Sequence, residues 1–587
     1  MCNDFVEYLN SMNNASSANE NALAESQVLN KYYDYIKVDR ELGSYIYNKL
    51  FNGDKKAIIL TGHAGDGKTS ILIQILDKLG YFENGKKALK QNELYNDKLF
   101  YVKDMSELDK KIQNKILKET LIYPNRGVSS FLISNTGPLI NTFENILDKE
   151  GFEELESDLL NALDTNNLED IKLTLDGEDC KFLVVNMAKL DNTYLIEKLL
   201  NRLIQPNLWE KCSLCEVKDK CPIYFNYFLC DKNRDRISDI IQKIYIWFQE
   251  NESRLTVRQM ISHLSFSLTG NLTCKQIKEN IIYKNNALFD YAFPNLFFGY
   301  KGTKCIQESL NIKAIKELNR INFDENALKA DYKLFVDEEF EMFDDKVREI
   351  LVKKIENSQK NLDFANQDGI NIRKAFRRYY IIISKLLDKE KDILVEDIFS
   401  EAFLIYDKIC KEKIALKDKV KLQDLVFTGL YKIFIGVYPI EGDKTLYLTL
   451  KKNLDDLQNV QLVLGEINTN LNMSIKQKEL DKSSKIENTN KKYETYICFS
   501  SCDEKLLLNL QTIQYFLRIN KGEVFTSFNP NFTVGINRLK ASLLSTYRYD
   551  KDLNKDENRE IRLLIIKKGN KETIKFTVEN NCMEVGV

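Results

Sequence analysis

Short apolar runs alternate with helical stretches from Lys56 onward. This alternation predicts a parallel sheet with helices on its faces, because parallel strands need crossover connections that are usually helical. We expect strands at Ala57–Thr61, Leu99–Lys103, Phe131–Ser134 and Phe182–Val185, and an apolar-periodic helix over Ser70–Leu79. Leu173–Leu175 is expected to join the last strand through a turn at Asp176-Gly177, which is a strong hairpin signal.

The pattern changes several times along the rest of the chain. Helical periodicity follows the sheet, Lys476–Lys492 is polar, and β character returns at Tyr493–Ser500. Ile561–Lys568 and Lys571–Val578 flank Gly569-Asn570 and predict a hairpin. The expected segments are an N-terminal helical segment (1–50), an α/β core (51–205), a cysteine-rich insert (206–235), a helical lid (236–330), a helical domain (331–475), a polar linker or loop (476–492) and a C-terminal α+β region (493–587).

Composition narrows the classes of protein. With 7 Pro and 23 Gly in 587 residues, the chain favours long helices over turn-rich β folds, and 2 His argue against histidine triads and His-rich metal centres. The 85 basic and 87 acidic side chains argue against a globally basic nucleic-acid binder. No secretory signal and no membrane span are found, so we expect a cytoplasmic protein whose 12 cysteines are reduced thiols or metal ligands.

One glycine-rich motif carries the strongest chemical signal. Residues 62–69, Gly-His-Ala-Gly-Asp-Gly-Lys-Thr, match G-x-x-x-x-G-K-[ST], with an apolar strand before them and a helix behind. Glycines let backbone N–H groups close around a phosphate, and the helix N-terminus adds its positive dipole. Lys68 is expected to reach the β- and γ-phosphates and Thr69 to hold Mg²⁺. ATP is therefore predicted to bind at Gly62, His63, Ala64, Gly65, Asp66, Gly67, Lys68, Thr69 and Ser70, with His63 as a shielding or packing side chain rather than a catalytic one.

An acidic residue at the end of a neighbouring strand should complete the Mg²⁺ site. Asp104 follows the predicted strand Leu99–Lys103, and Glu107 is placed to polarise the attacking water. Asp176 is the rival candidate, but Asp176-Gly177 also fits an ordinary hairpin turn.

Two predicted strands end in asparagine, a residue that can bond the γ-phosphate or the lytic water. Asn135 is our choice as this sensor over Asn186. Arg258 opens a helix beyond the sheet and is the candidate lid arginine, whereas His263 is interpreted as a packed side chain.

A basic helix face lies further along the chain, at Arg373, Lys374, Arg377 and Arg378. It suits either a nucleic-acid backbone or an arginine finger. The interpretation we favour is a solvated face that is salt-bridged to acidic residues.

Cys212, Cys215, Cys221 and Cys230 form a C-x2-C-x5-C-x8-C cluster. Such spacing suits tetrahedral thiolate coordination, so we predict a structural Zn²⁺; an iron–sulfur cluster and reduced core cysteines are the alternatives. Cys230 is the weakest ligand, and Cys180 or Cys274 could take its place.

The loop 62–69, the segment Asp104-Met-Ser-Glu107 and the knuckle ending in Cys221-Pro-Ile together resemble the DptF (DndF) family. That family supplies the ATPase component of bacterial DNA phosphorothioation-dependent restriction. The resemblance implies an ATPase that works with DndG- and DndH-like partners against DNA that lacks the host's phosphorothioate mark. ATP hydrolysis would drive assembly, DNA opening or translocation, and cleavage would lie elsewhere in the complex.

The sequence thus predicts an α/β P-loop NTPase fold, an AAA+-like parallel sheet flanked by helices, with a zinc-knuckle insert, a large helical region and a small C-terminal β-containing region. Its predicted activity is Mg²⁺-dependent ATP hydrolysis in an antiviral restriction complex that engages DNA, with homo-oligomers possible. Two alternatives stay open: a slow nucleotide switch that recruits an effector, and a replication-type loader.

Overall fold

The computed structural model describes most of the chain and divides it into two compact units. The first unit comprises Met1–Ile398 with Lys482–Thr489, and the second comprises Phe399–Asp481 with Asn490–Val587. The described residues are 2–13, 30–83, 88–166, 169–284, 286–324, 326–357, 367–450, 459–480, 487, 489–500, 502–523, 530–548, 559–567, 570–579 and 582–586.

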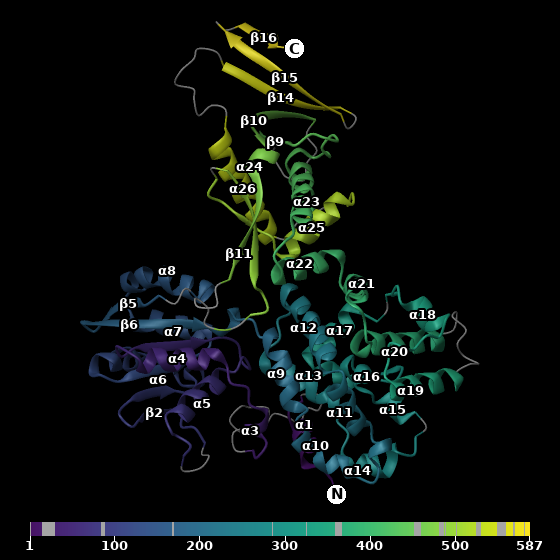
Figure 1. The fold of residues 1–587 in the computed structure, drawn as a ribbon. Helices are drawn as coiled ribbons and strands as arrows, with labels where there is room; N and C mark the ends of the chain where they lie inside the picture. The colour runs from purple at the N-terminus through teal and green to yellow at the C-terminus, as the bar shows by residue number, and fades with distance from the viewer. Residues whose placement is uncertain are drawn as a thin grey trace. The chain divides into compact units, whose positions relative to one another are not determined.

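A six-stranded sheet organises the N-terminal part of the first unit (Figure 1). Its strands are β1 (Ala57–Thr61), β2 (Asn92–Tyr95), β3 (Leu99–Val102), β4 (Ser129–Ile133), β5 (Ile171–Leu175) and β6 (Glu178–Asn186). The strand order is β2-β3-β4-β1-β6-β5. β3, β4, β1 and β6 run parallel, while β2 and β5 pair antiparallel at the two edges. The sheet is therefore mixed, with a parallel centre.

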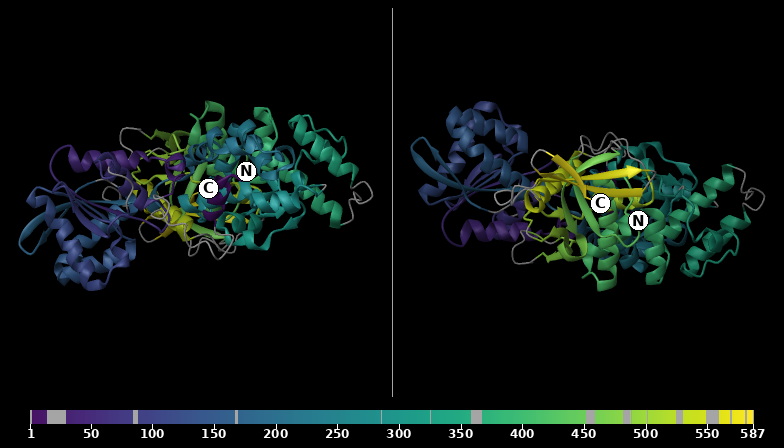
Figure 2. Two further views of the ribbon diagram at one scale, coloured as in Figure 1. Left: turned by 90° about the horizontal axis from the view of Figure 1, so that it is seen from below. Right: turned by 90° about the horizontal axis from the view of Figure 1, so that it is seen from above.

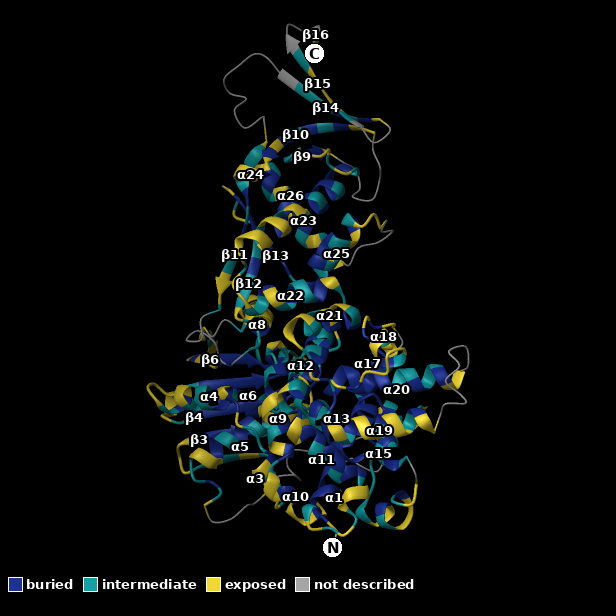
Figure 3. Ribbon diagram, turned by 45° about the vertical axis from the view of Figure 1, so that its right-hand side comes forward, coloured by how far each residue is buried: buried dark blue, intermediate teal, exposed yellow. Residues whose placement is uncertain are grey.

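Helices cover both faces of this sheet because its central strands are apolar on both sides. The helices are α4 (Glu41–Phe51), α5 (Lys68–Lys78), α6 (Lys110–Ile122), α7 (Thr136–Ile146) and α8 (Lys149–Thr165). Ile59 and Leu132 face a core formed with α6, α7 and α8, whereas Ile58 and Phe131 face a core formed with α4 and α5. Figure 3 shows these strands as buried.

The rest of the first unit is almost entirely helical. Its elements are α1 (Asp4–Ser11), α3 (Tyr33–Ile36), α9 (Ile196–Leu203), α10 (Pro206–Ser213), α11 (Pro222–Lys232), α12 (Arg234–Glu250), α13 (Val257–Thr269), α14 (Cys274–Gln276), α15 (Ala287–Asp290), α16 (Phe293–Phe297), β7 (Tyr300–Lys301), β8 (Lys304–Cys305), α17 (Lys313–Ile321), α18 (Asp331–Phe335), α19 (Asp345–Glu356), α20 (Gln367–Ile383) and α21 (Asp388–Ile398). α13 begins with a capping box formed by Thr256 and Gln259, and it ends at Gly270 in the left-handed conformation. Among the described residues, no helix is long and apolar enough to cross a membrane.

The basic face of α20 is largely an internal feature. Arg378 is 1% exposed; its guanidinium donates to Asp324 Oδ2 at 2.6 Å and to the Gly302 carbonyl at 2.7 Å. Arg377 is also buried and pairs with Asp331. The favoured ion pairs are therefore present, but the expectation of a solvated face was wrong for these two arginines.

His263 in α13 makes the stability of the protein depend on pH. It is fully buried, with Nδ1 2.7 Å from the Tyr245 hydroxyl and Nε2 2.7 Å from the Phe297 carbonyl oxygen. Burial lowers the pKa of this imidazole to about 4, although the bond to the carbonyl partly opposes the shift. Because the folded pKa lies below the ordinary value, stability from this group is present above pH ~6.5 and is lost as the pH falls toward 4.

We therefore expect the unfolding free energy to drop by about 2 kcal/mol between pH 7 and pH 5 on account of His263. Urea titrations of wild type and His263→Gln at both pH values measure the difference. His63→Gln is the matched control, because His63 is exposed and is the other of the chain's 2 histidines. Equal pH dependence in wild type and His263→Gln would contradict the assignment.

The second unit combines helices with two antiparallel sheets. Its elements are α22 (Glu401–Lys411), α23 (Leu416–Ile435), β9 (Thr445–Leu450), β10 (Val460–Asn468), α24 (Thr469–Asn472), β11 (Met473–Glu479), β12 (Tyr493–Phe499), β13 (Leu506–Leu507), α25 (Leu510–Asn520), α26 (Pro530–Tyr547), β14 (Arg559–Lys567), β15 (Asn570–Glu579) and β16 (Cys582–Gly586). One sheet has the order β16-β15-β14-β10-β9 and the other β11-β12-β13. Strands of the first sheet near the C-terminus are yellow in Figure 2.

The strands predicted for the six-stranded sheet of the first unit and the C-terminal hairpin β14–β15 of the second unit are confirmed. Two expectations about the second unit were wrong. β9 and β10 lie inside 331–475, which we expected to be helical, because Leu446 and Leu448 alternate with more exposed residues as in a half-buried strand. The predicted loop 476–492 starts within β11, whose polar residues are tolerated because they pair with β12 on a partly exposed sheet.

Candidate functional site

The glycine-rich loop, defined here as residues 62–67, joins β1 to α5. Gly62, Gly65 and Gly67 have φ values of 148°, 89° and 93°, which side chains rarely tolerate. A Cβ on Gly65 would also lie 3.0 Å from Thr256 Oγ1. The loop conformation therefore requires glycine, and it leaves the N-terminus of α5 facing open space.

Buried charges hold this loop in shape. The Asp66 side chain is fully buried; its carboxylate accepts from the His63 backbone N–H at 3.0 Å and from Arg254 Nη1 at 2.8 Å. Arg254 also donates to the carbonyls of Met187 and Leu190 at the end of β6. The Asp66 side chain thus stabilises the conformation of the loop through these hydrogen bonds.

Lys68 is the first residue of α5 and is itself buried. Its ammonium donates to the carbonyls of Gly62 at 2.8 Å and His63 at 3.1 Å, and to Asn135 Oδ1 at 2.8 Å. Asn135 follows β4 and precedes α7. Two side chains predicted to act together are therefore in direct contact.

A pocket of about 470 Å³ opens in front of the loop, and we call it the edge pocket. Residues 64–70 line it together with Asp104, Glu107, Asn135 and Arg258. Its remaining wall includes the apolar side chains Ile36, Val38, Leu195, Leu199, Val257 and Ile261. A polar end beside an apolar wall suits a ligand that combines an anionic group with a flat apolar one, and the volume is in the usual range for small-molecule sites.

The direction of the strands explains which acidic residue reaches this pocket. Asp104 follows the carboxyl end of β3, which runs parallel to β4 and hence to β1, and its Oδ1 accepts from the Ser106 backbone N–H at 2.9 Å. Glu107 is exposed at the rim. Asp176 lies in the turn that precedes β6, and β6 runs parallel to β1. Asp176 is therefore at the amino ends of the parallel strands, away from the loop, where it pairs with Lys118. The structure therefore brings Asp104, not Asp176, to the loop.

Of the other predicted site residues, Arg258 lies at the edge pocket, whereas Asn186 and His63 do not. Arg258, the second residue of α13, lines the edge pocket, and its backbone N–H donates to the Gly65 carbonyl at 3.2 Å. Asn186 is buried, with its amide committed to the backbone of Leu163 and Ala188. His63 has an exposed side chain and is not among the residues that line the pocket.

Lys68 and Arg258 are cationic side chains that line the edge pocket near the loop. Burial lowers the pKa of the Lys68 ammonium, although Asp104 and Asp66 partly offset this effect. Burial also lowers the pKa of the Arg258 guanidinium. A phosphate group in the pocket would stabilise both charged forms, so the electrostatics favour an anionic ligand.

Sequence reasoning missed a second buried pair beside the loop. Arg40 donates to Glu487 Oε1 at 2.7 Å, and the same guanidinium donates to the Asp66 carbonyl at 3.1 Å. The side chains of Arg40 and Glu487 are only 4% and 2% exposed. No motif marks these residues or Arg254, because they meet the loop only through the fold.

For the ATP hydrolysis that the sequence predicts, Asn135→Ala is expected to lower kcat about 10-fold to 100-fold with a smaller change in KM. The reason is that a polar contact beside the transferred group acts mainly in the transition state. Steady-state kinetics measure the split. Asn145→Ala, an exposed asparagine on the same helix α7, is the control and should retain full activity. A loss confined to KM would assign Asn135 to ground-state binding and contradict this expectation.

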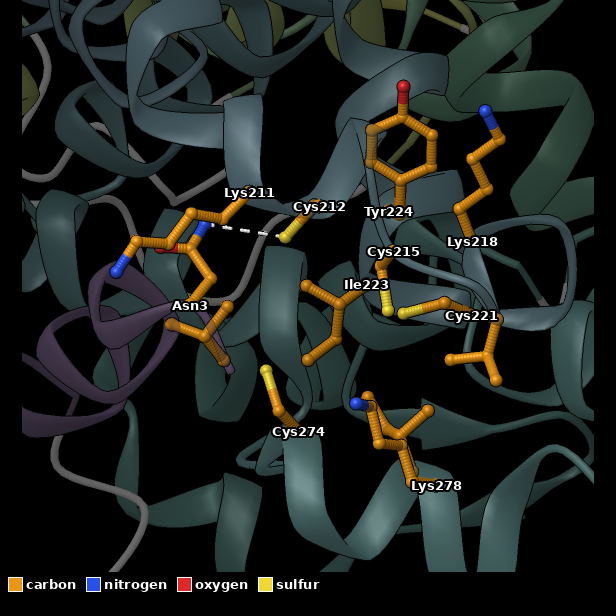
Figure 4. A pocket seen from close by; sticks show the side chains of 13 residues that line it. Asn3, Lys211, Cys212, Cys215, Lys218, Cys221, Ile223, Tyr224, Cys274 and Lys278 are labelled. Atoms are coloured by element: carbon orange, nitrogen blue, oxygen red, sulfur yellow. Dashed lines mark hydrogen bonds between the residues drawn. The ribbon is translucent and has the colours of Figure 1, made fainter. Parts of the chain in front are cut away.

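The cysteines occupy two different environments. Cys212, Cys215 and Cys221 line one small cavity together with Cys274, whereas Cys230 is absent from that lining (Figure 4). Cys230 is fully buried, and burial raises the pKa of its thiol well above the usual range. In the described part of the chain, no three Cys, His, Asp or Glu side chains stand as a ready-made metal-binding group.

Comparison with known proteins adds no assignment. The chain matches no protein-family model, no curated protein and no solved structure.

Proposed function

We propose that this protein is a Mg²⁺-dependent ATPase. The observation that supports it best is the convergence of the glycine-rich loop, Lys68, Asp104 and Asn135 on one pocket at the carboxyl ends of the sheet's parallel central strands. Ligands of open α/β folds bind at this edge. Loop amides and the α5 N-terminus would hold the phosphates, and the apolar wall would hold the base.

In this proposal the metal comes with the nucleotide. Mg²⁺ usually takes one or two protein ligands, with phosphate oxygens and water as the rest. Thr69 and Asp104 both line the edge pocket and would be those protein ligands. Lys68 and Arg258 would stabilise charge on the transferred phosphoryl group, and Glu107 would orient water.

We further propose that hydrolysis serves a restriction complex that acts on DNA without the host's phosphorothioate mark. The resemblance to the DptF family supports this step, with DndG- and DndH-like proteins as partners. The test is ATP hydrolysis by the full chain, alone and with such partners, in the presence of unmarked or phosphorothioate-marked DNA. We expect stimulation by unmarked DNA only. If neither DNA changes the rate of hydrolysis, the result would contradict the restriction role but not the ATPase proposal.

A second candidate, a nucleotide-controlled switch, is favoured by the Arg40–Glu487 pair. Glu487 belongs to the first unit, yet the chain enters and leaves its segment, Lys482–Thr489, from the second unit. Arg40 links this segment to the loop carbonyl of Asp66. Nucleotide bound at the loop would thereby bias the Arg40–Glu487 contact.

Glu487→Gln is therefore expected to speed dissociation of bound ADP about 10-fold, because a hydrogen bond to a charged group contributes about 1.5–3 kcal/mol. Stopped-flow release of a fluorescent ADP analogue measures it. Unchanged release from a folded variant would remove the support for a switch.

A further inference from the structure

We propose that Cys212, Cys215, Cys221 and Cys274 bind one zinc ion, with Cys274 rather than Cys230 as the fourth ligand. This inference is independent of the ATPase proposal. The four thiols come from three segments of the first unit: α10 and the turn after it, the residue before α11, and the start of α14. All four line the same cavity, and Figure 4 draws them together with the other residues of its lining.

The chain path explains why Cys230 cannot join them. It lies in the last turns of α11, more than two helical turns from Cys221, which precedes the same helix. Cys230 is fully buried outside the cavity, whereas Cys274 belongs to its lining. Position along the helix therefore separates Cys230 from the other cysteines.

The size of the cavity favours a single ion over a cluster. Its volume is about 20 Å³, close to the space that one water molecule needs. A single zinc ion held by the four lining thiolates fits such a space, whereas an iron–sulfur cluster, with several metal and sulfide atoms, would need the space to widen. Among the described residues the thiols do not stand as a finished metal-binding group, so coordination would require the four sulfurs to move closer together.

The surroundings suit an anionic metal centre. Zn²⁺ with four thiolates carries a net charge of −2, and Lys211, Lys218 and Lys278 line the same cavity. Asn3 Nδ2 donates to Cys212 Sγ at 3.3 Å, as outer-shell groups commonly do at metal sites. Asn3 is the N-cap of α1, so the bound ion would fasten that helix to α10, α11 and α14.

Metal analysis of the purified full chain tests the proposal. We expect about one zinc per chain in wild type, at least a fivefold loss in Cys274→Ser and Cys212→Ser, and full retention in the matched control Cys230→Ser. Full retention in Cys274→Ser, or loss in a folded Cys230→Ser variant, would overturn the ligand set. Iron with acid-labile sulfide would overturn the single-ion assignment.

Thiol labelling of the wild type keeps the test decisive if the variants fail to fold. In mass-spectrometric footprinting, all four thiols should be protected until a chelator is added, whereas the half-buried Cys305, which does not line the cavity, should react at the same rate with and without chelator. Labelling of Cys274 at the same rate with and without chelator would contradict the proposal.

Discussion

Replacing Lys68 by alanine is expected to lower kcat/KM for ATP hydrolysis at least about 100-fold, in line with the loss of a preorganised donor to developing phosphoryl charge. The Lys68 ammonium is buried and already hydrogen-bonded to Gly62, His63 and Asn135. It is therefore held at the loop before any ligand arrives, so a bound phosphate would meet a positioned cation.

A matched control separates this effect from damage to the helix. Lys78→Ala changes a lysine at the other end of α5 whose ammonium is exposed and donates to Ser44 Oγ at 2.8 Å. Its activity should stay within about twofold of wild type, because Lys78 is not among the residues that line the edge pocket. Equal hydrolysis by Lys68→Ala and wild type would show that catalysis does not pass through the glycine-rich loop.

Arg378→Met is expected to destabilise the first unit by about 3–5 kcal/mol, the usual cost of leaving one partner of a buried ion pair uncompensated. Asp324, which would lose its partner, is itself buried, and the guanidinium also binds Asn295 Oδ1 at 2.9 Å. Urea unfolding followed by tryptophan fluorescence measures the change, since Trp209 and Trp247 both lie in the first unit.

Two further variants test whether the loss of stability in Arg378→Met comes from a buried, unpaired charge. Arg348→Met breaks a surface pair with Asp345, whose carboxylate is 98% exposed, and should cost less than about 1 kcal/mol. Combining Arg378→Met with Asp324→Asn should cost less than the sum of the single changes, because the second change removes the orphaned charge. Full additivity, or a small effect of Arg378→Met alone, would contradict the burial argument.

The sheet was predictable because its signals are local. β1 spans the apolar run 57–61, which ends just before the first glycine of the loop. Asp104 and Asn135 follow the carboxyl ends of strands that run parallel to β1, so they lie beside the loop. β2 was missed because only four residues form it and they alternate between exposed and half-buried positions. β9, β10 and β11 of the second unit were also missed, because half-buried and exposed residues interrupt their apolar pattern, whereas β12, β14 and β15 were predicted.

The interactions that brace the candidate site could not be predicted from the sequence. Arg254, 188 residues beyond Asp66, contacts the loop directly, and Glu487, 421 residues beyond it, is connected to the loop through Arg40. Only the fold brings such residues together. The cysteine cavity shows the same limit. The spacing of Cys212, Cys215 and Cys221 marked a cluster, and the sequence offered Cys274 only as one of two substitutes for Cys230. The tertiary structure places Cys274 in the cavity lining. Local spacing identifies ligands within one turn, whereas a distant ligand needs the tertiary structure.

The central claim, that the edge pocket binds a nucleoside triphosphate, is tested most directly by calorimetric titration of the wild-type chain with ATP and Mg²⁺. We predict saturable binding of one ATP per chain that weakens at least about 10-fold in Lys68→Ala and is unchanged in Lys78→Ala. The absence of saturable binding to the folded wild type, or equal affinity in wild type and Lys68→Ala, would contradict it.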